Sequence, residues 1–282
     1  MKRLLVIILS VFIFTTSSAD TTQIKDKFFS SIESFLDSNF EDTDFSIKSK
    51  EGNKPEIGIL TLKPLIDNDD GLTFFQGSLF THDGDRETIN LGLGKRVFSE
   101  DKSFMYGLNV FYDHELDYNH QRGSIGGEIK SSILELNTNH YFGISEQRTG
   151  KNSIKEDVAD GYDLELGAHV PYMPSTKIYA KIFEYEIPGG SDFEGMEYSS
   201  NIGIPNSGLN VEVGFKDYGN SSYEDQWFLN LTFSTNKINK NMTLISEEAF
   251  EKISMQDKKY DKVRRENLIV KSKSFSVKTG GF

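Results

Sequence analysis

The 282-residue chain contains no cysteine, and this absence excludes several kinds of chemistry. Without thiols there is no disulfide, no thiolate nucleophile and no thiolate metal site. Basic residues are also scarce: 31 lysines and arginines stand against 43 aspartates and glutamates, which gives a net charge of −12. A nucleic-acid-binding domain needs a basic surface to replace phosphate counterions. We therefore expect no nucleic-acid partner.

Long apolar runs are equally scarce, and the one present begins at the fourth residue. Lys2 and Arg3 precede the run LLVIILSVFIF, and the small residues Ser17 and Ala19 follow it. This order is typical of a secretory signal peptide, residues 1–19, with cleavage predicted after Ala19. The alternative is an N-terminal membrane anchor, although the run is shorter than the roughly 18 residues that a spanning helix needs. Because no later run approaches that length, a mature chain that spans a membrane does so with strands.

Residues 20–42 are expected to form a short periplasmic segment with one amphipathic helix. Its apolar side chains recur at helical spacings, at Ile24, Phe28, Ile32 and Phe35.

From residue 43 to residue 234 the helical period is absent and apolar and polar residues alternate instead. Successive side chains of a strand leave opposite faces, so a period of two indicates strands. We predict twelve strands, at about 43–49, 56–63, 72–81, 87–97, 103–113, 121–130, 132–143, 161–171, 176–186, 196–204, 208–217 and 224–234. Short turns such as SEDK and PNSG alternate with long polar connections such as SEQRTGKNSIKEDVAD. This pattern predicts an all-β, twelve-stranded antiparallel transmembrane barrel over residues 43–235, with the short turns in the periplasm; a soluble β-sandwich is the alternative.

The two faces of the predicted strands differ in character. Residues 103–116, SFMYGLNVFYDHEL, carry rings at both ends of one stripe with aliphatic residues between them, as lipid-facing strands do where interfacial rings bracket the hydrocarbon band. The lipid-facing girdle candidates are Phe104, Tyr106, Tyr112, Trp227 and Phe233. The lumen-facing candidates are Asn90, Gly92, Gly94, Asn109, Asp163, Glu165 and Glu212. Lys95 shares the phase of Leu91 and Leu93, which indicates either a bulge or a side chain that snorkels to the membrane rim.

No group of residues gives a convincing catalytic or metal site, and we expect neither an enzyme nor a cofactor. GLGK at residues 92–95 lacks the spacing of a phosphate-binding loop. His114 and His120 share one predicted surface loop with Asp113, Glu115 and Asp117; weak cation binding is conceivable there, and a solvated loop is the simpler interpretation. Asp163 and Glu165 project to the same side, where we interpret them as polar pore lining and not as an acid–base pair.

Four segments resemble the β-barrel of the intimin and invasin family, the inverse autotransporters. They are LGLGKRVF (91–98), YGLNVFYDHELDYNHQRGSIGGE (106–128), DGYDLELGAHVPYMP (160–174) and YDKVRRENLIV (260–270). The resemblance implies a twelve-stranded outer-membrane barrel with a periplasmic N-terminus, whose linker turns back through the pore and carries a passenger to the cell surface. The matching tail positions are Tyr260, Asp261, Arg264, Arg265 and Asn267. About fifty residues follow the last predicted strand, so we expect the exported segment to be short.

The charge of residues 236–282 suggests how this tail is held. The segment carries eleven basic and six acidic residues, a net charge of +5, while the rest of the chain carries −17. We expect it to lie in the lumen, with Asp163, Glu165 and Glu212 as candidate partners; the alternative is a solvated tail in the periplasm.

The sequence therefore predicts a surface anchor and translocator of its own C-terminal segment. A barrel plugged by its tail, and an adhesin that acts through the loops 113–122 and 145–160, remain alternatives. The expected partners are the outer-membrane lipid bilayer, the outer-membrane protein insertion machinery, periplasmic chaperones, and a host or neighbouring-cell surface.

Overall fold

The computed structural model of the chain describes residues 42–84, 86–187, 191–219, 223–235 and 243–272. The predicted signal peptide and all but the last residue of the predicted segment 20–42 lie outside the described residues. No helix in the described part of the chain is long and apolar enough to cross a membrane.

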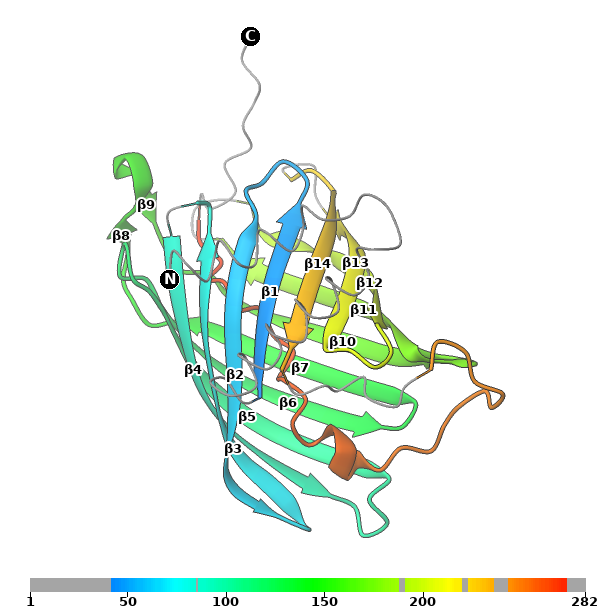
Figure 1. The fold of residues 1–282 in the computed structure, drawn as a ribbon. Coiled ribbons are helices and arrows are strands. Elements are labelled where there is room, and N and C mark those ends of the chain that lie inside the picture. The colour runs from blue at the N-terminus through cyan, green and yellow to red at the C-terminus, as the bar shows by residue number, and fades with distance from the viewer. Residues whose placement is uncertain (1–41, 85, 188–190, 220–222, 236–242, 273–282) are drawn as a thin grey trace, which may run out of the picture. The chain divides into compact units, whose positions relative to one another are not determined.

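The described residues form a closed antiparallel barrel of twelve strands (Figure 1). The barrel strands are β1 (Thr43–Lys50), β2 (Glu56–Asn68), β3 (Gly71–His82), β4 (Arg86–Phe98), β5 (Phe104–Glu115), β6 (Gln121–Ser131), β7 (Leu134–Gly143), β10 (Asp160–Val170), β11 (Met173–Glu186), β12 (Phe193–Gly203), β13 (Leu209–Tyr218) and β14 (Gln226–Ser234). Each strand pairs with its neighbours in chain order, and β1 pairs with β14 from Asp44↔Ser234 to Lys50↔Phe228, which closes the barrel. The predicted strands are all present and in the predicted order.

Several smaller elements were not predicted. The long connection between β7 and β10 contains a two-stranded hairpin, β8 (Arg148–Thr149) and β9 (Lys155–Glu156), and between them the 3₁₀ turn η1 (Lys151–Ser153). A second 3₁₀ turn, η2 (Met255–Lys258), follows β14. These elements are too short to produce a periodic pattern that a sequence could show.

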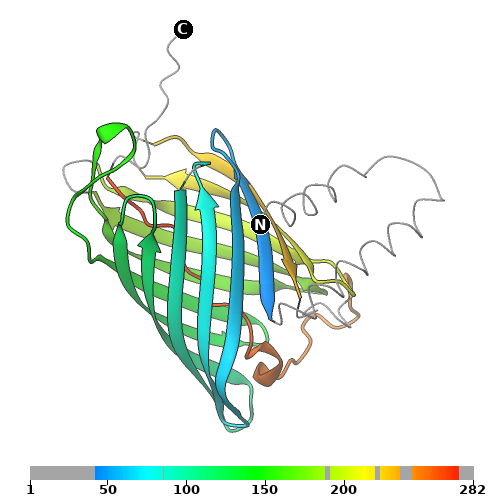
Figure 2. The same ribbon diagram turned by 60° about the vertical axis from the view of Figure 1, so that its left-hand side comes forward.

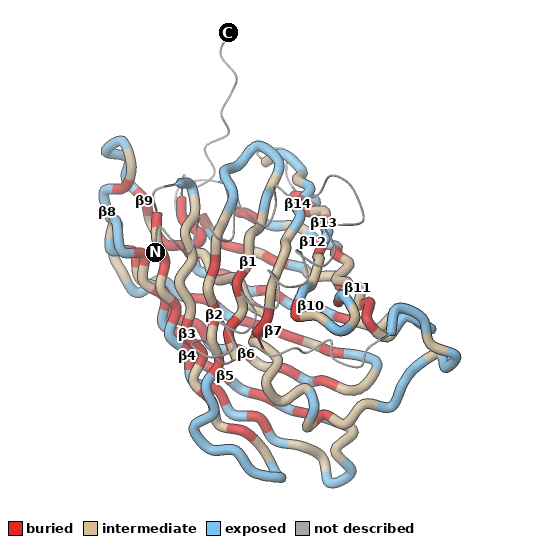
Figure 3. The backbone as a smooth tube through the Cα atoms, in the orientation of Figure 1, coloured by how far each residue is buried: buried red, intermediate tan, exposed pale blue. Residues whose placement is uncertain are grey.

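Burial alternates along the strands as a barrel in lipid requires (Figure 3). On β5, Leu108 is 71% exposed and the next residue, Asn109, is 4% exposed. The outward positions are mostly apolar, and many inward positions are polar or glycine, with aromatic and aliphatic side chains among them, which differs from the apolar interior of a soluble sandwich. The fold therefore buries its polar groups and presents its aliphatic groups to lipid.

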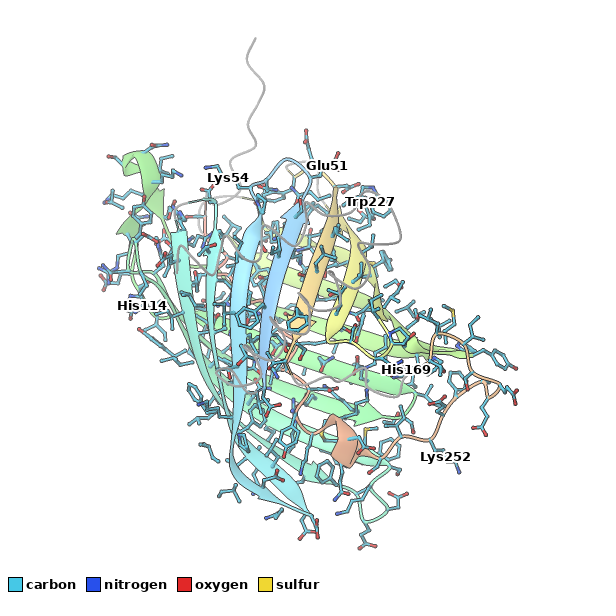
Figure 4. The ribbon with its side chains drawn as sticks, viewed as in Figure 1. Glu51, Lys54, His114, His169, Trp227 and Lys252 are labelled. Atoms are coloured by element: carbon cyan, nitrogen blue, oxygen red, sulfur yellow. The ribbon has the colours of Figure 1, made fainter. Side chains whose placement is uncertain are left out.

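The two ends of the barrel differ, and we name them by their connections. At the short-turn rim, β2–β3, β4–β5, β6–β7, β10–β11 and β12–β13 are joined by two to five residues. One of these turns is organised by Asp101, whose carboxylate accepts hydrogen bonds from Ser99 and Ser103; these bonds lower the pKa of that carboxyl to about 2. The opposite, long-loop rim carries the β8–β9 hairpin (Figure 2). Figure 4 shows Trp227, Glu51 and Lys54 together at this rim, and the amide of Glu51 donates to the carbonyl of Trp227.

Lys95 lies in regular pairing with Thr73 and Leu108, so no bulge intervenes and its exposed side chain lies on the outer face near the short-turn rim.

The predicted surface loop 113–122 is wrong at both ends. Asp113 and Glu115 belong to β5 and are fully buried on its inner face, because the strand continues two residues beyond its predicted end.

Candidate functional site: a lumenal track for the C-terminal segment

The described tail, residues 243–272, runs through the barrel from one rim to the other. At the short-turn rim the amide of Met255 donates to the carbonyl of Lys102 over 3.0 Å, and Lys259 Nζ lies 2.6 Å from the carboxylate of Asp67. At the long-loop rim the amide of Ser272 donates to the carbonyl of Asp157 over 2.9 Å. Figures 1 and 2 show this segment, coloured orange to red, passing from η2 through the barrel interior. Residues 259–272 are called the lumenal segment below.

The barrel wall holds the backbone of the lumenal segment through inward side chains. Arg122 donates to the carbonyls of Glu266 and Leu268 at 2.7 and 3.0 Å. Arg96 donates to the carbonyl of Lys259 at 2.5 Å. Asn90 and Asn139 donate to two further carbonyls, those of Asn267 at 2.9 Å and Arg264 at 3.0 Å. These contacts satisfy the carbonyl groups of a chain that forms no regular secondary structure of its own.

Two consecutive arginines of the lumenal segment reach opposite walls. Arg264 donates to Glu165 on β10 at 2.5 and 3.0 Å and to Glu212 on β13 at 3.1 Å. Arg265 makes two hydrogen bonds with Asp113 on β5 at 2.8 and 2.7 Å. Two-point contact between guanidinium and carboxylate fixes both position and orientation. The pair therefore sets the register of the tail within the barrel.

The guanidinium groups of these two arginines stack on aromatic rings of the inner face. Arg264 lies 3.8 Å from the ring centre of Tyr179, and Arg265 lies 4.2 Å from that of Phe111. Such stacking is favourable for a guanidinium over a ring face. The rings lie flat over glycines: a Cβ atom built on Gly92 would meet the Phe111 ring at 2.2 Å, and one built on Gly167 would meet the Tyr179 ring at 2.6 Å. Glycine at these inward positions makes room for the rings that receive the tail.

Apolar contacts hold the lumenal segment near both of its ends. Val263 packs with Leu62, Leu72, Phe74 and Phe111 toward the short-turn rim. Val270 packs toward the other rim in a buried cluster, whose remaining members are Tyr141, Ala159, Phe183, Tyr185, Ile187, Phe193 and Tyr218. A cavity of about 350 Å³ remains beside the segment, along β1 and β10–β14. The tail therefore leaves a polar crevice open on one side of the lumen.

The structure places the residues singled out from the sequence as follows. The inward candidates Asn90, Gly92, Gly94, Asn109, Asp163, Glu165 and Glu212 are buried on the inner face. The girdle candidates Phe104, Tyr106, Tyr112, Trp227 and Phe233 lie on the outer face, the first four of them exposed. Of the tail positions, Tyr260 bonds with Asp67 and Asp261 lies 3.6 Å from Lys130, while Arg264, Arg265 and Asn267 make the contacts given above.

Asp163 is not a direct partner of the tail. Its carboxylate accepts hydrogen bonds from Asn139 and Tyr141, each at 2.7 Å. The hydroxyl oxygen of Tyr141 in turn accepts a hydrogen bond from the backbone amide of Glu266. Asp163 therefore acts on the tail through the residues it holds, whereas Glu165 and Glu212 contact it directly.

Sequence reasoning missed the inward residues Arg96, Arg122, Glu115 and Tyr141, and it assigned no tail contact to Asp113, although the alternation gives Asp113 the phase of Asn109. Arg96 shares the phase of Gly92 and Gly94, so its inward direction was available from the alternation. The contact of Arg96 with the tail could not be predicted from the sequence, because a cation in a lumen can face water as easily as a bound chain.

The fold and the occupied lumen together define a class of protein: an outer-membrane β-barrel that holds a segment of its own chain in its pore. A family model described as "Inverse autotransporter, beta-domain" matches residues 15–267, and the chain belongs to this family. The family is one of adhesins and autotransporter barrels, not of enzymes. The lipid bilayer of the bacterial outer membrane is accordingly its environment.

Relatives in other bacteria are similar over part of their length. The chain is 30% identical over 175 residues to "Inverse autotransporter adhesin YeeJ" of Escherichia coli strain K12, which covers 60% of this chain and 7% of the relative. It is 25% identical to "Invasin" of Yersinia enterocolitica and 26% identical to "Intimin" of Escherichia coli O111:H-, over 68% and 74% of this chain and 23% of each relative. The chain thus spans less than a quarter of these three proteins. A structure solved in a study of in-meso crystallization of membrane proteins has the same fold, with a TM-score of 0.64, 20% identity, and coverage of 82% of this chain and 98% of that one.

Proposed function

We propose that the barrel anchors the chain in the outer membrane and exports the residues beyond Ser272 to the cell surface through its own lumen. The observation that carries the proposal is the continuous path of residues 255–272, which hydrogen-bond to the short-turn rim at one end and to the long-loop rim at the other. Outer-membrane barrels keep their short turns in the periplasm and their long loops outside. With that orientation the lumenal segment enters from the periplasm and leaves at the cell surface.

The contacts between the barrel wall and the lumenal segment are of two kinds, and together they would let a chain move through the lumen and then hold it in place. Arg96, Arg122, Asn90 and Asn139 bind backbone carbonyls, which every residue of a passing chain offers. The carboxylates of Asp113, Glu165 and Glu212 instead select cationic side chains. Export therefore ends when Arg264 and Arg265 reach these carboxylates, and the segment beyond them stays fixed outside.

Adhesion belongs to this proposal only through the relatives, whose names include an adhesin and an invasin. Applied to this chain, the exported segment and the long-loop rim are the surfaces available to a host or neighbouring cell.

An epitope tag placed after Phe282 tests the export. We expect an antibody to bind the tag on intact cells, at a level close to that of a tag inserted in the β8–β9 hairpin. A tag detected only after the outer membrane is permeabilised would contradict export and leave a barrel plugged by its tail.

A further inference from the structure

A buried cluster of potential metal ligands lies where the tail leaves the barrel. Glu115 at the end of β5, His120 just before β6 and Glu156 on β9 each present one ligand atom, and these atoms lie within 4.8 Å of one another. All three side chains are buried. His82, at the end of β3, adds an imidazole nitrogen 3.6 Å from Glu115 Oε2.

Two cations neutralise this cluster in the threaded barrel, and one of them belongs to the tail. Arg86 on β4 bonds with Glu115 at 3.2 Å and with Glu156 at 2.6 Å. The ammonium of Lys271, which is 1% exposed, bonds with Glu115 Oε2. Without Lys271 the two carboxylates face a single permanent cation, so the cluster carries a net negative charge in a place shielded from water.

His120 is oriented as a metal ligand would be. Its Nδ1 lies 3.1 Å from Glu115 Oε1, while its Nε2 is buried, has no hydrogen-bond partner among the described residues, and lies 3.5 Å from Glu156 Oε2. A carboxylate that accepts the proton of one ring nitrogen fixes the tautomer that directs a lone pair outward from the other. In this tautomer the free lone pair of His120 points toward the carboxylate of Glu156.

We propose that this cluster is a divalent-cation site, in which His120 Nε2 and Glu156 coordinate Zn²⁺ and Glu115 holds the His120 ring. The ammonium of Lys271, bonded to Glu115, neutralises the cluster when the tail is in place, and Zn²⁺ binds when that ammonium is absent. Imidazole and carboxylate together are ligands that Zn²⁺ prefers, whereas Ca²⁺ and Mg²⁺ prefer oxygen alone. Lys271 and Zn²⁺ are cations held by the same buried cluster, so each weakens the binding of the other. Because linkage is reciprocal, Zn²⁺ at the cell surface weakens the hold on Lys271 as much as Lys271 weakens Zn²⁺ binding.

Calorimetric titration of the full-length folded chain in detergent with ZnCl₂ tests the site. Lys271→Met removes the competing charge and keeps an unbranched apolar stem. We expect this variant to bind about one Zn²⁺ per chain at least tenfold more tightly than the unaltered chain, and the added substitution His120→Ala to abolish that binding. Lys271→Gln, which retains a hydrogen-bond donor for Glu115, provides the same comparison where methionine is not tolerated.

Lys259→Met is the matched control. Lys259 is also a tail lysine paired with a carboxylate, that of Asp67 at 2.6 Å, and the pair includes no histidine. Its loss is expected to leave Zn²⁺ binding unchanged. Equal Zn²⁺ binding by the Lys271 variants and the unaltered chain, tight binding that survives His120→Ala, or equally tight binding of CaCl₂ would each overturn the proposal.

Discussion

The guanidinium of Arg265 and the carboxylate of Asp113 form a two-point ion pair inside the lumen, and neither side chain is accessible to water. The two residues are 152 positions apart in the sequence. Asp113 is shared, because Arg122 of the neighbouring strand also bonds with it at 2.8 Å. The tail is therefore one half of a buried charge network whose other half belongs to the barrel wall.

Removing Arg265 should destabilise the barrel, although Arg122 remains beside Asp113. Loss of one partner of a buried ion pair costs about 3 kcal/mol or more, and the remaining arginine favours the lower value. We expect Arg265→Ala to lower the free energy of unfolding by about 3 kcal/mol. Urea unfolding in lipid vesicles measures this, with Lys252→Ala as the control because Lys252 is an exposed residue of the same tail. Equal stability of the two variants would show that the pair contributes nothing.

Adjacent residues of β14 test which face meets lipid. Leu229 is exposed on the outer face, whereas Asn230 lines the crevice beside the tail. We expect Leu229→Arg to lower the stability of the folded barrel by about 2–4 kcal/mol, as a charge near the bilayer midplane does. We expect Asn230→Arg to leave most of the protein as folded barrel, measured as the heat-modifiable band in gel electrophoresis. Similar losses from both would show that the assigned faces are wrong. Asn109, another lumen-facing candidate, is unsuitable for this comparison because its amide lies against Gly126 in a packed part of the lumen.

The glycines beneath the aromatic rings should not tolerate even a methyl group. Gly92→Ala places a Cβ atom 2.2 Å from the Phe111 ring, which must then move away from Arg265. Overpacking of this kind costs about 1–3 kcal/mol. Gly127→Ala is the matched control, because the nearest atom to its Cβ lies 3.6 Å away. The thermal unfolding midpoint should fall for Gly92→Ala alone; a fall of the same size in both variants would contradict the role given to the ring.

Deletion of residues 236–282 should leave barrel insertion intact and open the pore. Strand β14, QWFLNLTFS, ends before the tail begins and pairs with β1 to close the barrel, so the deletion leaves all twelve strands in place. The deletion removes the chain that lies between the walls, so single-channel conductance in planar bilayers should rise well above that of the full chain. Failure of the shortened protein to reach the membrane would show instead that the tail is needed for assembly.

The sequence predicted the barrel well because alternation is a local property. Each strand carries its own evidence for which face is apolar, and β10 or β13 could be recognised without knowing its neighbours. The charge balance likewise indicated that a basic tail belongs with an acidic wall, and two of the three carboxylates proposed for it, Glu165 and Glu212, do contact Arg264.

The pairing within the lumen was beyond reach for a different reason. Which carboxylate meets which arginine depends on the stagger of twelve strands and on the depth of the tail, and neither is encoded within one strand. Asp113 lies in the predicted strand 103–113 with the phase of Asn109, so its inward direction was available. Glu115 was taken for a loop residue, and its inward direction follows only once β5 is known to continue to Glu115. At the exit, Glu115 and His120 flank one connection, whereas Glu156 comes from the separate connection between β7 and β10, and only the closed barrel brings it to them.

The absence of cysteine from the chain allows a direct measurement of whether the tail crosses the membrane through the lumen. Single cysteines introduced at Lys252, before the lumenal segment, and at Lys278, after it, are treated on intact cells with a membrane-impermeant maleimide. If the tail is threaded through the lumen, position 278 is labelled on intact cells and position 252 only after the outer membrane is permeabilised. Labelling of both positions under the same condition, whichever it is, would contradict this threading.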